Sequence, residues 1–316
     1  MPLIQSNYSA PPFLKGGHLQ TIAAKFYTTQ LIEFRRELRL DSTGQTQVAY
    51  DFIDGDSQKP LIVLFHGLEG SSQSHYAQAF ARFAKQHNLP FVVVHFRSCG
   101  GIENTAPVFY HSGDSAEIGF VLNKLHQETG KKPFVVGVSL GGNALAKYLG
   151  ETGKNAACQA AAVVSAPLDL IIATQAFALP FARTVYTPYF LKTLIPKARK
   201  IMPTADWRHC YSLKDFDDRF TAPLHGFDDA MDYYRKSSAK PFLANVAVPT
   251  IVINAQNDPF MPANALPRAD EVSEQVFLMY PNEGGHVGFM DNRRQDKLSW
   301  LPECVLDFFN GSFQAA

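Results

Sequence analysis

Gly137-Val-Ser-Leu-Gly141 is the stretch of this sequence best suited to covalent chemistry. The apolar run Pro133–Val138 leads into it, and the helix-forming stretch Asn143–Leu149 follows. In that setting, G-x-S-x-G forms a sharp strand-to-helix turn that exposes the serine hydroxyl. Small residues on both sides let the strand and the helix pass closely. We therefore predict that Ser139 is a nucleophile; the alternative is an ordinary strand-to-helix turn.

Histidine is the side chain that most often takes the proton of a nucleophilic serine. Where G-x-S-x-G makes such a turn, the acid and then the histidine follow the serine along the chain. Three of the 10 histidines follow Ser139, namely His209, His225 and His286. Only His286 lies beyond the last predicted strand, in the glycine-containing segment Glu283–Phe289. We predict that His286 is the base.

An acidic side chain must orient this histidine, and it should follow the carboxyl end of a core strand. Asp258 comes just after the apolar run Thr250–Asn254 and 28 residues before His286, which leaves room for one helix and one strand. Asp169 follows the preceding predicted strand, Ala161–Val164. We predict that Asp258 is the acid, and Asp169 is the alternative.

Backbone amides are the donors that a negatively charged tetrahedral intermediate requires. One should be the amide of Leu140, directly after the nucleophile. The other should come from the loop after the first buried strand, His66-Gly-Leu-Glu-Gly70, whose glycines let the backbone turn inward. We predict that Leu68 supplies this second amide.

Alternating strands and helices must position these residues. Unbroken apolar runs alternate with helix-like segments after Pro60, a pattern typical of a parallel sheet covered on both faces. The predicted strands are Leu61–Phe65, Phe91–Phe96, Phe134–Val138, Ala161–Val164, Thr250–Asn254 and Gln275–Tyr280. The predicted helices are Tyr76–His87, Ser115–Glu128, Asn143–Gly150 and Leu301–Phe309. Ile32–Leu40 and Gln47–Ile53 flank a turn and predict a hairpin. We expect one α/β domain over residues 1–316, with an N-terminal arm over residues 1–30.

Residues 166–247 interrupt this alternation, because they contain no convincing buried strand. The segment is far longer than an ordinary connection and consists of helix-like pieces separated by prolines. We predict a helical lid within the domain, above the carboxyl ends of the strands. Its aromatic side chains Phe177, Phe181 and Tyr186 are candidates for a substrate pocket. The alternative is that these rings only bury the lid against the sheet.

The charge balance and apolar pattern exclude several kinds of partner. The chain has 29 basic and 29 acidic side chains, so its net charge gives no reason to expect nucleic acid. No uncharged apolar run approaches the length of a membrane span. The N-terminus lacks the pattern of a signal peptide. The cysteines are scattered without paired spacing, which predicts reduced thiols in a cytoplasmic protein.

Cofactor and metal motifs do not occur in the sequence. It has no H-E-x-x-H, no nucleotide-binding glycine loop after the first parallel strand and no clustered Cys/His set. Asp206, His209 and Cys210 lie close together in sequence but lack a fourth ligand. We predict no cofactor and no metal.

Several segments together resemble the YheT-like esterase branch of the α/β-hydrolases, which is related to embryogenesis-associated and abhydrolase-domain esterases. The resemblance spans almost the whole chain. Its motifs are Pro12–Thr21, His66–Ser72, Tyr110–Gly113, Gly137–Asn143, Thr221–Phe227, Tyr233–Arg235, Asn257–Phe260 and Gly284–Gly288. It implies the α/β-hydrolase fold and a triad of Ser139, Asp258 and His286. Ser98 stands where this branch has glycine, and Asn257 replaces an aspartate beside the acid.

The predicted activity is hydrolysis of carboxylic esters by a serine esterase through an acyl-enzyme. The expected partner is a small ester, acyl or lipid-like, and the aromatic lid is compatible with peripheral contact with lipid. The same three residues also serve thioesterases and acyltransferases, which are the nearest alternatives. A binding protein that keeps the hydrolase fold without turnover is an alternative of another class.

Overall fold

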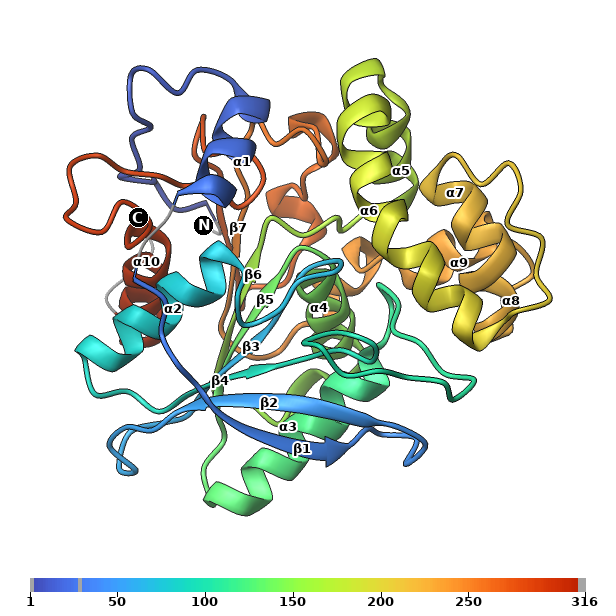
Figure 1. The fold of residues 1–316 in the computed structure, drawn as a ribbon. Helices are drawn as coiled ribbons and strands as arrows, with labels where there is room; N and C mark the ends of the chain where they lie inside the picture. Colours follow the sequence, from blue (N-terminus) through green and yellow to red (C-terminus); the bar gives the residue numbers. More distant parts are fainter. Residues whose placement is uncertain (1–2, 28–29, 312–316) are drawn as a thin grey trace.

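An eight-stranded β-sheet forms the centre of the computed structural model, which describes residues 3–27 and 30–311. The strand order is β1-β2-β4-β3-β5-β6-β7-β8 (Figure 1). β1 pairs antiparallel with β2, and β2 pairs antiparallel with β4, whereas the remaining pairs are parallel. The strands are β1 (Arg35–Leu40), β2 (Gln47–Ile53), β3 (Ile62–Phe65), β4 (Phe91–Val94), β5 (Phe134–Val138), β6 (Ala160–Val164), β7 (Thr250–Ile253) and β8 (Val276–Met279).

The parallel strands are apolar along almost their whole length because helices cover both faces of the sheet. Alternate side chains of a strand point to opposite faces. Ile62 and Leu64 of β3 belong to the apolar core that α2 and α10 cover, whereas Val63 and Phe65 belong to the core beneath α3 and α4. These helices are α2 (His75–Gln86), α3 (Ser115–Thr129), α4 (Leu140–Thr152) and α10 (Trp300–Phe309). The predicted mostly parallel sheet flanked by helices is confirmed.

Two helices differ from the predictions by more than two residues at an end or by their presence. Helix α4 begins at Leu140, immediately after Ser139, and not at Asn143. The N-terminal arm contains a helix, α1 (Gly17–Phe26), that the sequence analysis did not predict. None of the helices in the described ranges combines the length and apolar character needed to cross a membrane.

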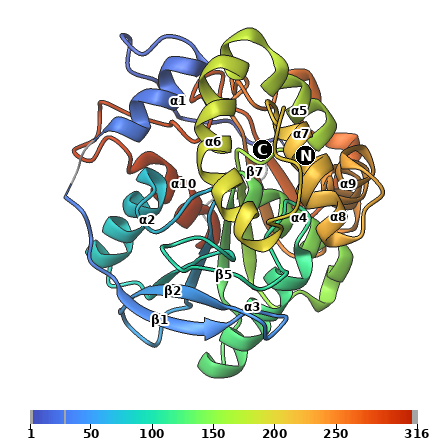
Figure 2. The same ribbon diagram turned by 45° about the vertical axis from the view of Figure 1, so that its right-hand side comes forward.

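Helices connect β6 to β7, and Figures 1 and 2 show α5 to α9 grouped on one side of the molecule. They are α5 (Leu170–Ala178), α6 (Pro180–Ile201), α7 (Leu213–Phe216), the π-helical turn η2 (Asp217–Thr221), α8 (Ala222–His225) and α9 (Ala230–Ser237), followed by the 3₁₀ turn η3 (Lys240–Asn245). α6 continues through Pro188 and Pro196, although each proline removes one backbone donor from the helix. The two prolines therefore do not end the helix, although prolines in a sequence usually predict a break.

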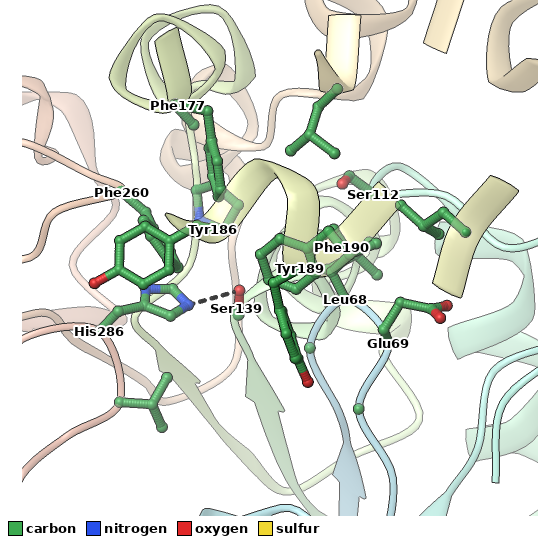
Figure 3. Close-up of a pocket in the computed structure, with 18 of the residues that line it drawn as sticks. Leu68, Glu69, Ser112, Ser139, Phe177, Tyr186, Tyr189, Phe190, Phe260 and His286 are labelled. Atoms are coloured by element: carbon green, nitrogen blue, oxygen red, sulfur yellow. Dashed lines mark hydrogen bonds between the residues drawn. The ribbon is translucent and has the colours of Figure 1, made fainter. Parts of the chain in front are cut away.

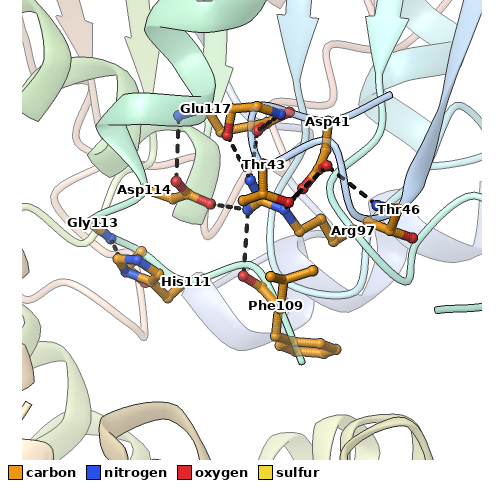
Figure 4. A network of polar contacts seen from close by, with 12 residues as sticks. Asp41, Thr43, Thr46, Arg97, Phe109, His111, Gly113, Asp114 and Glu117 are labelled. Carbon is orange, nitrogen blue, oxygen red and sulfur yellow. Dashed lines mark hydrogen bonds and ion pairs between the residues drawn. The ribbon is translucent and has the colours of Figure 1, made fainter. Parts of the chain in front are cut away.

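Arg97 joins the hairpin to the main body of the sheet through buried ion pairs (Figure 4). Its guanidinium contacts Asp41 at 2.5 Å, Asp114 at 2.5 Å and Glu117 at 2.6 Å. Burial raises the pKa of Glu117, an effect that the positive charge of Arg97 opposes. Arg97 also donates to the carbonyl oxygen of Phe109 at 3.4 Å, so the same cation holds the loop that leads into α3.

Replacing Arg97 with methionine should destabilise the fold strongly, because three buried carboxylates would lose their counter-charge. Removing one partner from a buried ion pair typically costs about 3–5 kcal/mol of unfolding free energy. Urea denaturation followed by circular dichroism would measure the change. Arg208→Met is the matched control, since Arg208 and its partner Asp206 are solvent-exposed, and it should leave the midpoint unchanged. Equal midpoints for the two variants would contradict the structural role of Arg97.

Candidate active site

Ser139 lies in the turn between β5 and α4. Its backbone angles, φ 52° and ψ −119°, are a conformation that residues other than glycine rarely adopt. The flanking glycines are required by close packing. A Cβ atom on Gly137 would lie 2.6 Å from the carbonyl oxygen of Gly141, and one on Gly141 would lie 2.6 Å from that of His66. The turn therefore needs both glycines and holds Ser139 in a strained position.

Ser139, His286 and Asp258 form a continuous hydrogen-bonded chain. The His286 Nε2 atom is 3.0 Å from the Ser139 Oγ atom, a contact drawn in Figure 3. The His286 Nδ1 atom is 2.9 Å from Oδ2 of Asp258, whose side chain is fully buried. Because a carboxylate only accepts, Nδ1 carries the hydrogen and Nε2 can accept the serine proton. The structure thus brings together the three residues on which the sequence analysis converged.

The histidine loop, Glu283–Phe289, carries His286 and is held in place by the N-terminal arm. The amide of His286 donates to Thr21 Oγ1 at 2.8 Å, and the amide of Gly284 donates to Gln20 Oε1 at 2.9 Å. Asn257 completes the network, because its Oδ1 accepts from the amide of Gly285 and its Nδ2 donates to Gln20, both at 2.9 Å. Asn257 therefore positions the histidine loop, a role that the sequence analysis did not find.

The arm approaches this loop so closely that only glycine fits at two positions. A Cβ atom on Gly17 would lie 1.8 Å from the carbonyl oxygen of Asn257. Gly285 has φ 60°, and a Cβ atom there would lie 2.6 Å from the carbonyl oxygen of Gly17. The paired glycines of the arm and of the histidine loop thus form one contact.

The loop after β3 is fixed by a neutral histidine. His66 is fully buried, and burial lowers its pKa to about 3, so the ring is uncharged near neutral pH. Its Nε2 accepts from the amide of Phe96 at 3.1 Å. Its Nδ1 therefore donates to the carbonyl oxygen of Gly67 at 2.8 Å. His66 sets the direction of the loop and takes no part in proton transfer.

The amides of Leu68 and Leu140 are left unpaired beside Ser139. On either side of Leu68, the amides of Gly67 and Glu69 donate to the hydroxyls of Tyr76 and Tyr110. No protein group in the described ranges accepts a hydrogen bond from Leu68 or Leu140. A Cβ atom on Gly67 would lie 3.0 Å from that of Ser139, so the loop and the serine are in contact.

Glu69, the residue after Leu68, is anchored to α6. It has φ 56°, and its carboxylate is buried. The Lys197 ammonium on α6 contacts both carboxylate oxygens at 2.8 Å, and the Tyr110 hydroxyl donates to Oε1 at 2.8 Å. An ion pair thus links the loop that carries the Leu68 amide to the helical segment between β6 and β7.

A cavity of about 590 Å³ opens at Ser139 and His286 (Figure 3). Phe177 of α5 and Tyr186 of α6 line it, as do Tyr189, Phe190 and Phe260. The Phe260 ring lies 4.3 Å from the His286 ring between centroids. Phe181 does not line the cavity; its ring packs against His18 at 4.2 Å and is 42% exposed.

The remaining candidate residues have other contacts. Asp169, the alternative acid, caps α5 by accepting from the amides of Ile171 and Ile172. Asp206 pairs with Arg208, and Cys210 is a buried free thiol. Across the described part of the chain, no group of three or more His, Cys, Asp and Glu side chains is placed to hold a metal ion.

Comparison with known proteins agrees with this architecture. Residues 60–293 match the model of the alpha/beta hydrolase fold family. YheT of Escherichia coli (strain K12) is 34% identical over 311 residues, spanning 94% of this chain and 91% of YheT. Phospholipase ABHD3 of Homo sapiens is 27% identical over 308 residues, spanning 92% of this chain and 75% of ABHD3. The solved Pyrococcus furiosus esterase Pf2001 superposes with a TM-score of 0.58 at 14% identity, covering 88% of this chain and 91% of Pf2001.

Proposed function

The chain belongs to the alpha/beta hydrolase fold family, and we propose that it is a serine esterase that cleaves carboxylic esters through an acyl-enzyme. The hydrogen-bonded chain from Ser139 through His286 to Asp258 carries this proposal. Names of related proteins include a phospholipase, and the superposed structure is an esterase; both names denote the cleavage of ester bonds.

In the proposed reaction, Ser139 Oγ attacks the ester carbonyl while His286 Nε2 takes its proton. The histidine then donates this proton to the departing alcohol oxygen, and the acyl group stays on Ser139. Water, deprotonated by the same Nε2 atom, hydrolyses the acyl-enzyme and restores the serine. Asp258 holds the ring in the required tautomer and stabilises its charged form.

The unpaired amides of Leu68 and Leu140 are suited to receive the carbonyl oxygen as it becomes negative. Both belong to backbone that is fixed before the substrate arrives, so little reorganisation accompanies the reaction. We assign these two amides as the oxyanion hole.

The helical segment over residues 166–247 is the proposed lid of this site. Its helices α5 and α6 supply Phe177, Tyr186 and Phe190 to the cavity wall, which is therefore largely apolar on that side. Such a wall suits an acyl or other apolar substituent. The natural substrate on this proposal is a small ester with an apolar portion.

Hydrolysis of p-nitrophenyl esters from acetate to palmitate would test the proposed function. The wild-type protein should release p-nitrophenol and the free acid, and a serine-directed phosphonate should label it covalently. Adding a primary alcohol distinguishes acyl transfer, since a transferase would form the new ester in place of free acid. Absence of both turnover and labelling would contradict the proposal.

Replacing Lys197 with methionine should lower kcat about tenfold with little change in KM, because Glu69 would lose its cation and the Leu68 amide its fixed position. Deleting an oxyanion donor outright costs about 10²–10³ in kcat, and loosening its loop should cost less. Lys197→Arg keeps the charge and should recover most of the rate. Lys200→Met on the same helix removes an exposed pair with Glu103 and should have no effect. A wild-type kcat for Lys197→Met would contradict this role.

The proposal also places the protein in the cytoplasm. All four cysteines are buried free thiols, a state that a reducing compartment maintains. They are Cys99, Cys158, Cys210 and Cys304.

A further inference from the structure

Asp217 is an acidic side chain in the wall of the cavity that contains Ser139. It begins the π-helical turn η2, and such turns are frequent at functional sites. The hydroxyl of Thr221 donates to its Oδ1 at 2.6 Å, and the hydroxyl of Tyr234 donates to its Oδ2 at 2.7 Å. An ionised carboxyl group has about four acceptor positions, so two remain after these bonds.

No basic side chain in the described ranges forms an ion pair with Asp217. Lys214, on the neighbouring helix α7, pairs instead with Asp218 at 2.5 Å. The cavity wall around Asp217 is otherwise mostly apolar or aromatic. It includes Leu170, Leu194, Leu213, Phe216, Tyr233 and Tyr234. A carboxyl group in such surroundings interacts strongly with any donor that reaches it.

The cavity connects Asp217 to the reacting serine. Ser112 and Tyr233 both line it, and the amide of Ser112 donates to the Tyr233 hydroxyl at 2.9 Å. Figure 3 shows Ser112 across the cavity from His286, with Ser139 between them. A substrate bound at Ser139 can therefore extend past Ser112 toward α9 and Asp217.

We propose that Asp217 binds a hydrogen-bond donor, a hydroxyl or an ammonium group, at the end of the substrate remote from its ester carbonyl. This inference rests on the proposed esterase function and narrows its substrate class. The preferred esters would have an apolar middle portion and a polar end. Asp217 would then select substrates without contacting the reacting atoms.

Ligand binding tests this inference independently of turnover. Calorimetry would compare, at each chain length from four to twelve carbons, a 1-alkanol, the α,ω-diol and the ω-amino alcohol. At the length that reaches Asp217, the diol or the amino alcohol should bind about tenfold to a hundredfold more tightly than the alkanol, as expected for a hydrogen bond to a charged group. Absence of such a preference at every length would overturn the inference.

Asp217→Leu removes both acceptor oxygens and should therefore remove most of this preference. Asp218→Asn, which removes the same charge at the next position and lies outside the cavity wall, should keep it. A preference that persists in Asp217→Leu would also overturn the inference. Short esters such as p-nitrophenyl acetate report the esterase function separately: if wild type hydrolyses them but lacks the ligand preference, only the inference fails. If ligands show the preference but no ester is cleaved, only the proposed function fails.

The pH dependence of wild-type binding distinguishes the two donors and requires no variant. Burial raises the pKa of Asp217 to about 6, against the effect of the hydroxyls of Thr221 and Tyr234. The charged and titratable groups around it are Lys214 and Asp218, which pair with each other, together with Tyr233, Tyr234 and Cys210. Affinity for an ammonium group should fall as pH drops through 6, because the carboxyl becomes neutral. Affinity for a hydroxyl should change less, since a protonated carboxyl still accepts. An ammonium preference that is unchanged from pH 8 to pH 5 would contradict the assignment to Asp217.

Discussion

Replacing Ser139 with alanine should lower kcat for ester hydrolysis by a factor on the order of 10⁶. The expected loss is this large because the nucleophile and the base act as a unit. Without the Ser139 hydroxyl, no acyl-enzyme forms, and His286 has no nucleophile to deprotonate. Initial rates on the preferred p-nitrophenyl ester would measure it, with the unfolding midpoint recorded to show that the variant is folded.

Two controls accompany this variant. Ser57→Ala changes an exposed serine in the turn before β3 and should retain the wild-type rate. A serine-directed phosphonate should label wild type and Ser57→Ala but not Ser139→Ala. Substantial turnover or labelling in Ser139→Ala would show that another residue is the nucleophile.

Asp258→Asn should reduce kcat by roughly 10⁴ while leaving the backbone in place. An asparagine amide can present N–H to the Nδ1 atom of His286, which moves the ring hydrogen to Nε2. The histidine would then donate toward Ser139 when it should accept. Steady-state kinetics over pH 6 to 9 would measure the loss.

Asp169→Asn is the matched control for the acid. Asp169 caps α5 and makes no contact with His286, so its replacement should leave kcat close to wild type. It should cost little stability, because asparagine caps a helix about as well as aspartate does. Near-normal turnover in Asp258→Asn together with a large loss in Asp169→Asn would reverse the assignment.

The core strands and the serine turn could be predicted because their signals are local. Strands β3 to β8 are short apolar runs bounded by turn residues, and the glycines around Ser139 are required by contacts within a few residues or with the neighbouring strand. The order of serine, acid and histidine then restricted the remaining choices. Each of these inferences needs only one stretch of sequence at a time.

The long-range contacts that hold His286 and the loop of the Leu68 amide in place could not be predicted in this way. Thr21 and His286 are 265 residues apart, and Glu69 and Lys197 are 128 residues apart. Nothing in the sequence around a threonine or a lysine indicates which distant residue it will contact. The sequence shows the glycines of the N-terminal arm and of the histidine loop. Their contact with each other depends on how the arm packs against that loop in the folded protein, which the sequence does not show.

The orientation of a helix about its own axis also could not be predicted, as Phe181 shows. Phe181 and Tyr186 were predicted to line one pocket, yet both lie on α6, five positions apart. Positions with this separation differ by about 140° around an α-helix. Tyr186 therefore lines the cavity, while Phe181 packs against His18 at the surface. An aromatic-rich segment indicates a pocket wall without saying which rings form it.

The hydrogen bonds from the N-terminal arm to the histidine loop show that the site depends on residues outside the stretch that matches the family model. Residues 60–293 match the family model and contain Ser139, Asp258 and His286. Gln20 and Thr21, which fix the histidine loop, lie outside that stretch. The stretch that matches the family model therefore lacks part of what the site needs. Expressed alone, it would contain every proposed reacting side chain but not the two residues of the N-terminal arm that hold the His286 loop in place.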